Sequence, residues 1–222
     1  GGNYNVCVGD EAGTAITTGD SNTALGYNAL TSEDEGNQNT AIGHNALANL
    51  NSGTNYNVAV GSGAGTQVTT GAANTFLGGI AGQFVSTASS STFVGYSAGL
   101  GITGAKLTGA NNTAIGRDAG LLLQGAAQGN TLVGKGSGDS ITTAIENVLI
   151  GQSAGTDLVT GGRNTIIGNN AGANVTTSNN TFVGANGTAG GCGEEMTSGD
   201  ANTIIGGYNG TSGNLDLTTA SN

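Results

Sequence analysis

The chain has 222 residues, 44 of them glycine, with no proline or tryptophan, and its 14 acidic and four basic side chains give a net charge of −10. A nucleic-acid partner requires clustered lysine and arginine side chains, so this charge argues against one. No apolar run approaches the length of a membrane span and no signal peptide is visible, so membrane insertion is not expected.

One short pattern, Asn-Thr-x-aliphatic-Gly or a close variant, recurs from one end of the chain to the other. Valine replaces threonine in three copies, and serine replaces asparagine in one. Each copy reads as a short strand bounded by turn residues. In chain order the twelve copies are 5–9, 22–26, 39–43, 57–61, 74–78, 91–95, 112–116, 130–134, 147–151, 164–168, 180–184 and 202–206. Their glycines are mostly 17 or 18 residues apart, so one copy per coil of a solenoid is expected.

The apolar residues of each copy predict which faces of the strand are covered. The second residue is threonine or valine and the fourth is aliphatic, and we expect both to line the core because side chains two apart share a face. The third residue would then face outward, yet it is apolar in every copy, which indicates burial on both faces. We therefore expect sister chains to cover it. The trimer-interface candidates are Ala24, Ala41, Ala59, Phe76, Phe93, Ala114, Leu132, Leu149, Ile166, Phe182 and Ile204.

The remaining positions of the repeat predict corners and a second wall. Glycine ends every copy, which indicates a tight corner with positive φ. Asparagine begins eleven copies, with Ser91 in the other, and stacked asparagine side chains can hydrogen-bond along a column. The segment after the glycine usually ends in Ala-Gly or Ala-Leu, and the small alanine predicts a narrow second wall.

These features predict an all-β fold, a single-chain parallel β-solenoid of the β-roll or β-helix type, with about 12 coils and a repeat of ~17 residues. Coils stacked about 4.8 Å apart give a rod on the order of 55 Å long. Its core is thin, so oligomerisation is the expected supplement. We expect the solenoid over residues 1–213 and a C-terminal exit segment over 214–222, and we interpret the chain as a piece of a longer protein or a processed form.

No catalytic residue, cofactor site or metal site is predicted. His44 is the only histidine, and it follows the glycine of its copy at a position that varies from coil to coil, which is typical of an exposed site and not of a catalytic base. Asp20, Asp139 and Asp200 recur in turn sequences, without the nonapeptide pattern that binds Ca²⁺. Cys7 and Cys192 belong to the first and eleventh coils, too far apart for a disulfide.

Two kinds of feature are candidates for contact with a receptor. The segments Leu100–Asn111 and Asn186–Asn202 make two coils longer than the others, and insertions in repeat proteins often hold the binding function, although chance loop variation remains open. The position after the glycine supplies the residue candidates, which are Tyr27, His44, Tyr96 and Arg117.

The stretch Asn39–Gly61, which reads NTAIGHNALANLNSGTNYNVAVG, resembles the repeats of bacteriophage tail fibres and related virion appendages. It is also similar to the Asn-Ser-Val-Ala-Ile-Gly repeats in the head domains of trimeric autotransporter adhesins, whose period is shorter and which usually have valine before the alanine. The similarity covers nearly the whole chain. It implies a parallel β-roll or β-helix, three chains around one axis, a virion or extracellular location, and attachment to a host surface.

We therefore expect a structural fibre or adhesin segment that forms a homotrimeric rod and positions or mediates host attachment, with a host glycan or protein and other appendage proteins as partners. A monomeric ice- or glycan-binding solenoid is the alternative, motivated by the repeated threonine, although that threonine is expected to point inward. A polysaccharide-degrading tailspike is disfavoured, because Glu33, Asp34, Glu35, Glu194 and Glu195 lie in expected loops and not in carboxylate pairs.

Overall fold

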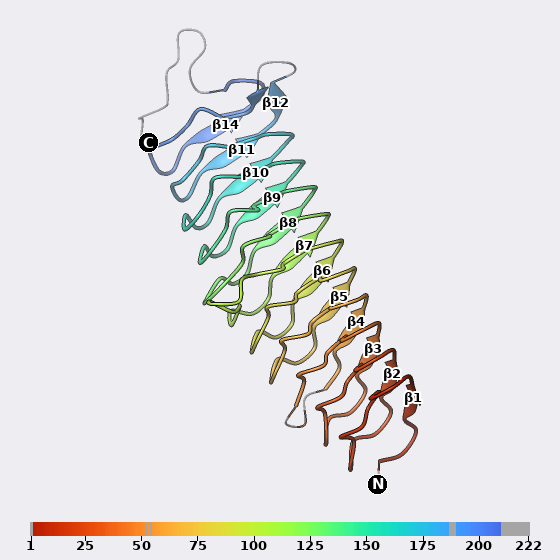
Figure 1. Cartoon of the computed structure of the whole chain (residues 1–222). Coiled ribbons are helices and arrows are strands. Elements are labelled where there is room, and N and C mark those ends of the chain that lie inside the picture. The colour runs from red at the N-terminus through yellow and green to blue at the C-terminus, as the bar shows by residue number, and fades with distance from the viewer. Residues whose placement is uncertain (1, 52, 54, 187–189, 210–222) are drawn as a thin grey trace.

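The structure is a computed structural model that describes residues 2–51, 53, 55–186 and 190–209. It is an all-β parallel solenoid of about ten turns with a repeat of ~17 residues (Figure 1). The exit segment expected at 214–222 and part of the longer coil at 186–202 lie outside the described residues. The predicted parallel β-solenoid and its ~17-residue repeat are confirmed, whereas the turns number about ten and not the predicted 12.

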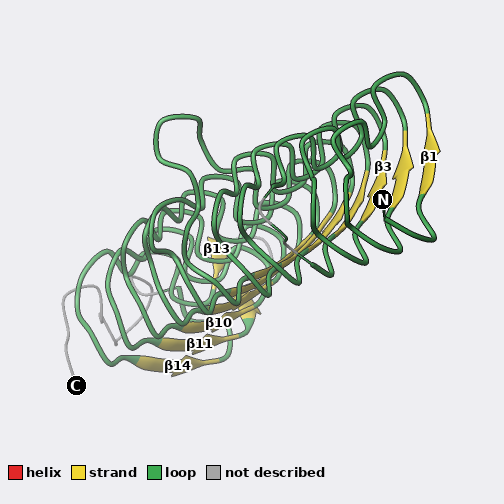
Figure 2. Ribbon diagram, turned by 90° about the horizontal axis from the view of Figure 1, so that it is seen from below, coloured by secondary structure: helices red, strands yellow, loops and turns green. Residues whose placement is uncertain are grey.

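Each of the twelve copies of the repeat forms one strand of a single sheet, in chain order. The strands are β1 (Val6–Val8), β2 (Thr23–Leu25), β3 (Thr40–Ile42), β4 (Val58–Val60), β5 (Thr75–Leu77), β6 (Thr92–Val94), β7 (Thr113–Ile115), β8 (Thr131–Val133), β9 (Val148–Ile150), β10 (Thr165–Ile167), β11 (Thr181–Val183) and β14 (Thr203–Ile205). The short strands β12 (Ala185–Asn186) and β13 (Gly190–Gly191) pair separately and antiparallel. In Figure 2 the sheet runs along one side of the coil, and loops and turns form the remaining walls.

All strands of the sheet pair without any shift of register. Ala24 lies opposite Ala41, and Phe93 lies opposite Ala114 although the intervening coil is longer than its neighbours. Extra residues are therefore accommodated outside the sheet, and each strand position of the repeat forms a continuous column along the rod.

The predicted orientation of the strand side chains is wrong. The third-position residues point into their own coil, where all eleven interface candidates are buried, ten of them with no exposed surface and Ile204 with 5%. The second and fourth positions face outward: Leu25, Leu77 and Ile115 are 45%, 47% and 40% exposed. Because the candidates are covered by their own chain, Ala24, Ala41, Ala59, Phe76, Phe93, Ala114, Leu132, Leu149, Ile166, Phe182 and Ile204 do not face a second chain.

The leading asparagine explains this orientation. Side chains alternate along a strand, so the asparagine, the third residue and the glycine share one face. The asparagines from Asn22 to Asn202 are buried inside the coil, and the backbone N–H of each donates to the Oδ1 of the asparagine one coil earlier, as from Asn147 to Asn130 at 3.1 Å. The exception is Asn112, whose N–H donates to Ser91 Oγ. The Nδ2 of Asn130 donates to Asn112 Oδ1 at 3.0 Å and to the Ala144 carbonyl at 2.8 Å. The predicted asparagine column is confirmed, and it lies in the interior.

The corner glycines allow successive coils to approach closely. Gly116 has φ of 132°, and a Cβ there would lie 2.6 Å from the carbonyl oxygen of Gly134 in the next coil. Gly26, Gly43 and Gly134 have the same conformation and contact the next corner glycine in the same way. Both the φ and the stacking distance therefore require glycine, as predicted.

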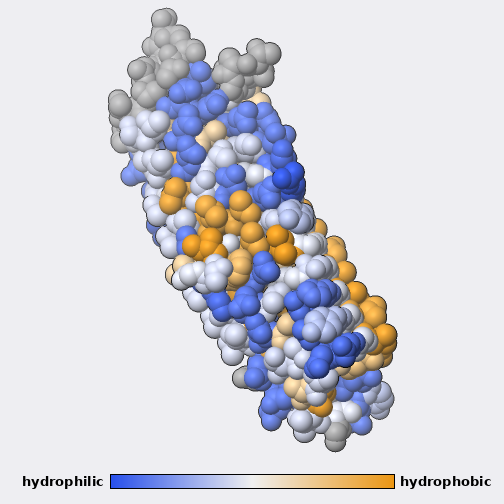
Figure 3. Space-filling view, in the orientation of Figure 1, coloured by the Kyte–Doolittle hydropathy of each residue, from blue (hydrophilic) through white to orange (hydrophobic). Residues whose placement is uncertain are grey.

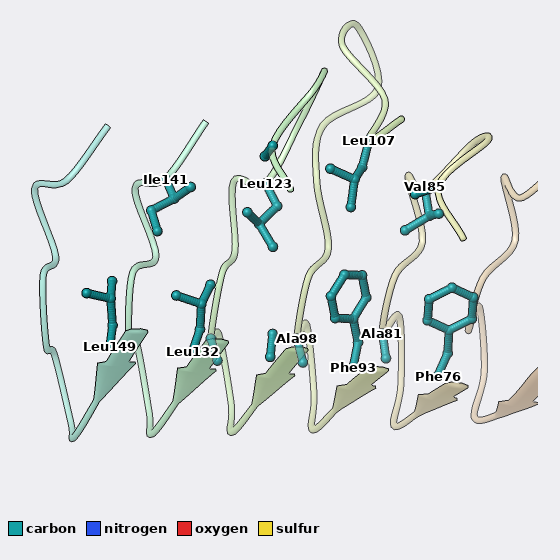
Figure 4. Close-up of a cluster of buried hydrophobic side chains, with 14 of the residues drawn as sticks. Phe76, Ala81, Val85, Phe93, Ala98, Leu107, Leu123, Leu132, Ile141 and Leu149 are labelled. Carbon is teal, nitrogen blue, oxygen red and sulfur yellow. The ribbon is translucent and has the colours of Figure 1, made fainter. Parts of the chain in front are cut away.

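The second wall of the coil complements the strand in volume. Where the third residue is Phe76 or Phe93, the facing wall has glycine, and a Cβ on Gly65 would lie 2.7 Å from the Phe76 ring. Where the third residue is alanine in the coils of β2 and β3, the wall has the buried Leu30 and Leu47 instead, at φ of 54° and 49°. Figure 4 shows Phe76, Phe93, Leu132 and Leu149 pointing from the strands toward Val85, Leu107, Leu123 and Ile141 on the far wall. The predicted narrow wall is confirmed, since Ala81 and Ala98 have no exposed surface.

We predict that Asn130→Ala lowers the free energy of unfolding by about 2–4 kcal/mol, because it leaves the buried N–H groups of Asn147 without their acceptor. Urea denaturation followed by circular dichroism measures the change. Asn49→Ala is the control: this asparagine is exposed and outside the column, so a change of at most about 0.5 kcal/mol is expected. Equal losses in the two variants would contradict the role of the column.

We predict a second destabilisation, again of about 2–4 kcal/mol, for Gly116→Ala, since the methyl group meets a backbone oxygen and the φ is unfavourable for alanine. Thermal melts of this variant are compared with those of Gly104→Ala. A Cβ on Gly104 would have no heavy atom within 4 Å, so its melting temperature should not fall. If the Gly116→Ala variant melted at the same temperature as the wild type, the corner would not require glycine.

Candidate functional site

The outer face of the twelve-stranded sheet carries two straight columns of side chains. The fourth-position column is aliphatic throughout, and Val8, Leu25, Leu77, Ile115 and Ile150 are between 37% and 56% exposed. The second-position column holds threonine in nine strands and valine in three. Over the lower part of the rod in Figure 3, hydrophobic side chains gather along the right-hand edge, where Figure 1 draws the strands. We call these two columns the outer stripe.

The outer stripe is a candidate functional surface that the expectations from the sequence did not include. Neither column contains a charged residue, although both face away from the core. The signal was present in the pattern, since an asparagine repeated at the first position of almost every coil can form a buried column of stacked amides. If asparagine is inside, alternation places the second and fourth residues outside.

The structure brings the four receptor-contact candidates into one exposed column beside the corner glycines. The rings of Tyr27 and His44 stack in adjacent coils, with centroids 5.6 Å apart and an interplanar angle of 16°. Tyr96 is 58% exposed, and the N–H of Asp118 in the next coil donates to its carbonyl at 3.0 Å. Arg117 follows Tyr96 in that column and pairs with Asp118 at 2.9 Å. The candidates form two groups, Tyr27 with His44 and Tyr96 with Arg117.

Acidic side chains in the turns accept hydrogen bonds from the backbone. Glu33 is fully buried, and its Oε1 accepts the N–H groups of Glu35, Gly36 and Gly53 at 3.2, 2.6 and 3.3 Å. Glu194 Oε2 accepts the N–H of Gly191 at 2.6 Å. These carboxylates hold turns, and both glutamates lie in loops as expected.

The longer coil at Leu100–Asn111 is partly built into the solenoid. Leu107 is fully buried and forms parallel bridges with Val85 and Gly125, so it continues the far wall. Lys106 Nζ donates to Gln67 Oε1 at 2.9 Å and ties the segment to an earlier coil. Only its middle extends outward, with Ile102 37% exposed.

The two cysteines have different surroundings. Cys7 is exposed and Cys192 is buried, and neither is in a disulfide. Burial raises the pKa of both thiols, and for Cys192 a backbone hydrogen bond acts in the opposite direction. A raised pKa reduces the thiolate population at neutral pH, so neither side chain has the character of an activated nucleophile.

Within the described residues, no cluster of three or more histidine, cysteine, aspartate or glutamate side chains could hold a metal ion. The same part of the chain contains no helix that could span a membrane. Comparisons with protein-family models, with curated proteins and with solved structures found no match to this chain.

Proposed function

We propose that the chain is a structural fibre segment of a virion or surface appendage, which forms a homotrimeric rod and positions or mediates attachment to a host surface. The observation that carries the proposal is the outer stripe. It extends along twelve strands spaced about 4.8 Å apart, on the order of 55 Å, and is uncharged throughout. An uncharged stripe of this length, with one of its two columns aliphatic throughout, is typical of a face that another molecule covers.

Other copies of this chain are the molecules that would cover the outer stripe best. Every coil presents the same pair of residue types at the same place, so a second copy offers a matching ridge along its whole length. In a homo-oligomer with closed symmetry, every chain would then contribute its own outer stripe to the interface. The number three comes from the resemblance of the repeats to those of trimeric fibres and adhesins, and the resemblance also supports a virion or extracellular location.

The reversed orientation of the strands alters which residues carry the trimer. The sequence analysis assigned the contacts to the third position, whose side chains fill the coil interior. The proposal now assigns them to the fourth position, with the threonine column beside it. The inference that an outward apolar row needs a cover is therefore retained, while its residues are replaced.

We predict that the wild-type chain sediments as a trimer at micromolar concentration and that Leu77→Glu dissociates it, because three buried carboxylates would meet near one axis. Analytical ultracentrifugation measures the mass. Val159→Glu is the matched control, since Val159 is 42% exposed, comparable with 47% for Leu77, and lies outside the sheet. A wild-type chain that remains a folded monomer would contradict the proposal.

A monomeric ice-binding solenoid is the second candidate, and the outward threonines favour it. The sequence analysis counted against it because threonine was expected inside the coil, whereas the structure places nine threonines in the outer column. A straight row of hydroxyl and methyl groups at regular spacing could order water. The proposed fibre covers this row, so it excludes the activity.

We therefore predict no thermal hysteresis for the purified chain at the concentrations at which it sediments as a trimer. A nanolitre osmometer measures the gap between melting and freezing, with Leu77→Glu as a comparison in which the stripe is uncovered. Thermal hysteresis from a monomeric wild-type chain would replace the fibre proposal with the ice-binding one.

A further inference from the structure

A cavity of about 370 Å³ lies at the corner that precedes strands β9, β10, β11 and β14. Its walls include Ile145, Gly162, Arg163, Ser178, Asn179 and Asp200. This volume is within the range of small-molecule sites. The cavity is distinct from the outer stripe and from the column of Tyr27 and His44.

The cavity lies between the turns that precede successive strands. The residue two places before the leading asparagine forms its own column, which holds Asp20, Asn37 and Asn55 in early coils and Ile145 and Gly162 in later ones. At Gly162 a Cβ would lie 3.0 Å from the Ile145 carbonyl oxygen, so the coils that carry these two residues lie close together. The cavity is lined by this column and by the residues beside it, from Ile145 to Asp200.

Backbone hydrogen bonds hold the polar walls in position. The N–H of Gly162 donates to Ser178 Oγ at 3.1 Å, and the N–H of Ser178 donates to Asp200 Oδ1 at 2.8 Å. The Asn179 N–H donates to the Gly162 carbonyl at 3.0 Å. The Asp200 carboxylate and the Ser178 hydroxyl are therefore oriented before any ligand arrives, which lowers the entropic cost of binding.

The chemistry of the walls selects a neutral, hydroxyl-rich ligand. Asp200 accepts hydrogen bonds, Arg163 donates them, and the Asn179 amide does both, while Ile145 offers an apolar surface. Arg163 Nε already pairs with Glu146 Oε2 at 2.8 Å, so its charge is balanced. An anion would meet Asp200 and the field of a chain with net charge −10, and is disfavoured.

We propose that this cavity binds one neutral sugar unit, with its hydroxyl groups on Asp200, Arg163 and Asn179 and its apolar ring face on Ile145. The inference rests on the attachment role in the proposed function, and it names the receptor chemistry as a neutral glycan. It also moves receptor contact from the four candidates of the sequence analysis to a different corner of the coil.

Isothermal titration of the full chain with glucose, galactose, mannose and N-acetylglucosamine tests whether a free sugar binds, and an array of neutral, sialylated and sulfated oligosaccharides tests glycan binding. Asp200→Asn retains an acceptor for the Ser178 N–H but loses the charge, and we expect affinity to fall about tenfold. Arg163→Gln should weaken binding to a similar degree.

Two matched controls lie elsewhere on the rod. Asp20→Asn changes the same column position, where Asp20 Oδ1 accepts the Asn3 N–H at 2.6 Å outside the cavity. Arg117→Gln removes a guanidinium whose side chain is 65% exposed, as is that of Arg163, and which is also paired with a carboxylate. Neither control should alter the affinity, and all four variants should melt at the wild-type temperature.

Saturable binding of a neutral sugar that only the two cavity variants weaken supports the proposal. Absence of binding to every neutral sugar, a preference for anionic sugars, or equal losses in the controls overturns it. Sedimentation of the same samples separates this outcome from that of the fibre: a trimer without sugar binding overturns the cavity alone, and a sugar-binding monomer overturns the trimeric rod alone.

Discussion

Amide-to-amide hydrogen bonds inside the coil connect almost every turn of this rod to the next. Burying an asparagine without hydrogen-bond partners would reduce the free energy of unfolding by several kcal/mol. Each asparagine must therefore lie within hydrogen-bond distance of the acceptor in the previous coil. The column continues across Ser91, whose N–H donates to Asn74 Oδ1 at 3.0 Å and whose Oγ accepts the Asn112 N–H at 3.3 Å. This requirement explains why strands stay in register across coils of different length.

The asparagine column also fixes which residues the rod shows to its surroundings. With asparagine inside, the third residue is inside and the second and fourth are outside, whatever their hydrophobicity. Sequence reasoning could find the strands, the corner glycines such as Gly116 and the alanine wall, because each has a distinctive residue type at a fixed spacing. It could not choose the inner face by hydrophobicity, since Phe76 and Leu77 are both apolar neighbours, and only the burial of Asn74 decides between them.

For the same reason the sequence could not predict that the side chains of the strand and of the facing wall complement each other in size. Leu47 faces a strand with Ala41, whereas the glycines near Phe76 and Phe93 make room for the rings, which lie 5.7 Å apart. Leu47 adopts a left-handed φ of 49°, a conformation that is costly for leucine, and the burial of its side chain offsets that cost. The pairing could be recognised only once the third position was known to point inward.

The interior requirements leave the outer positions of the strand unconstrained, and this makes their composition informative. Nothing inside the coil requires Leu25, Ile115 or Ile150, because the asparagine column, the corner glycines and the far wall would form equally well with polar residues there. Twelve successive strands nevertheless keep a branched aliphatic residue at this site, without one charge. We propose that this composition reflects cover by a second copy of the chain, because a copy with the same spacing would meet every one of these positions.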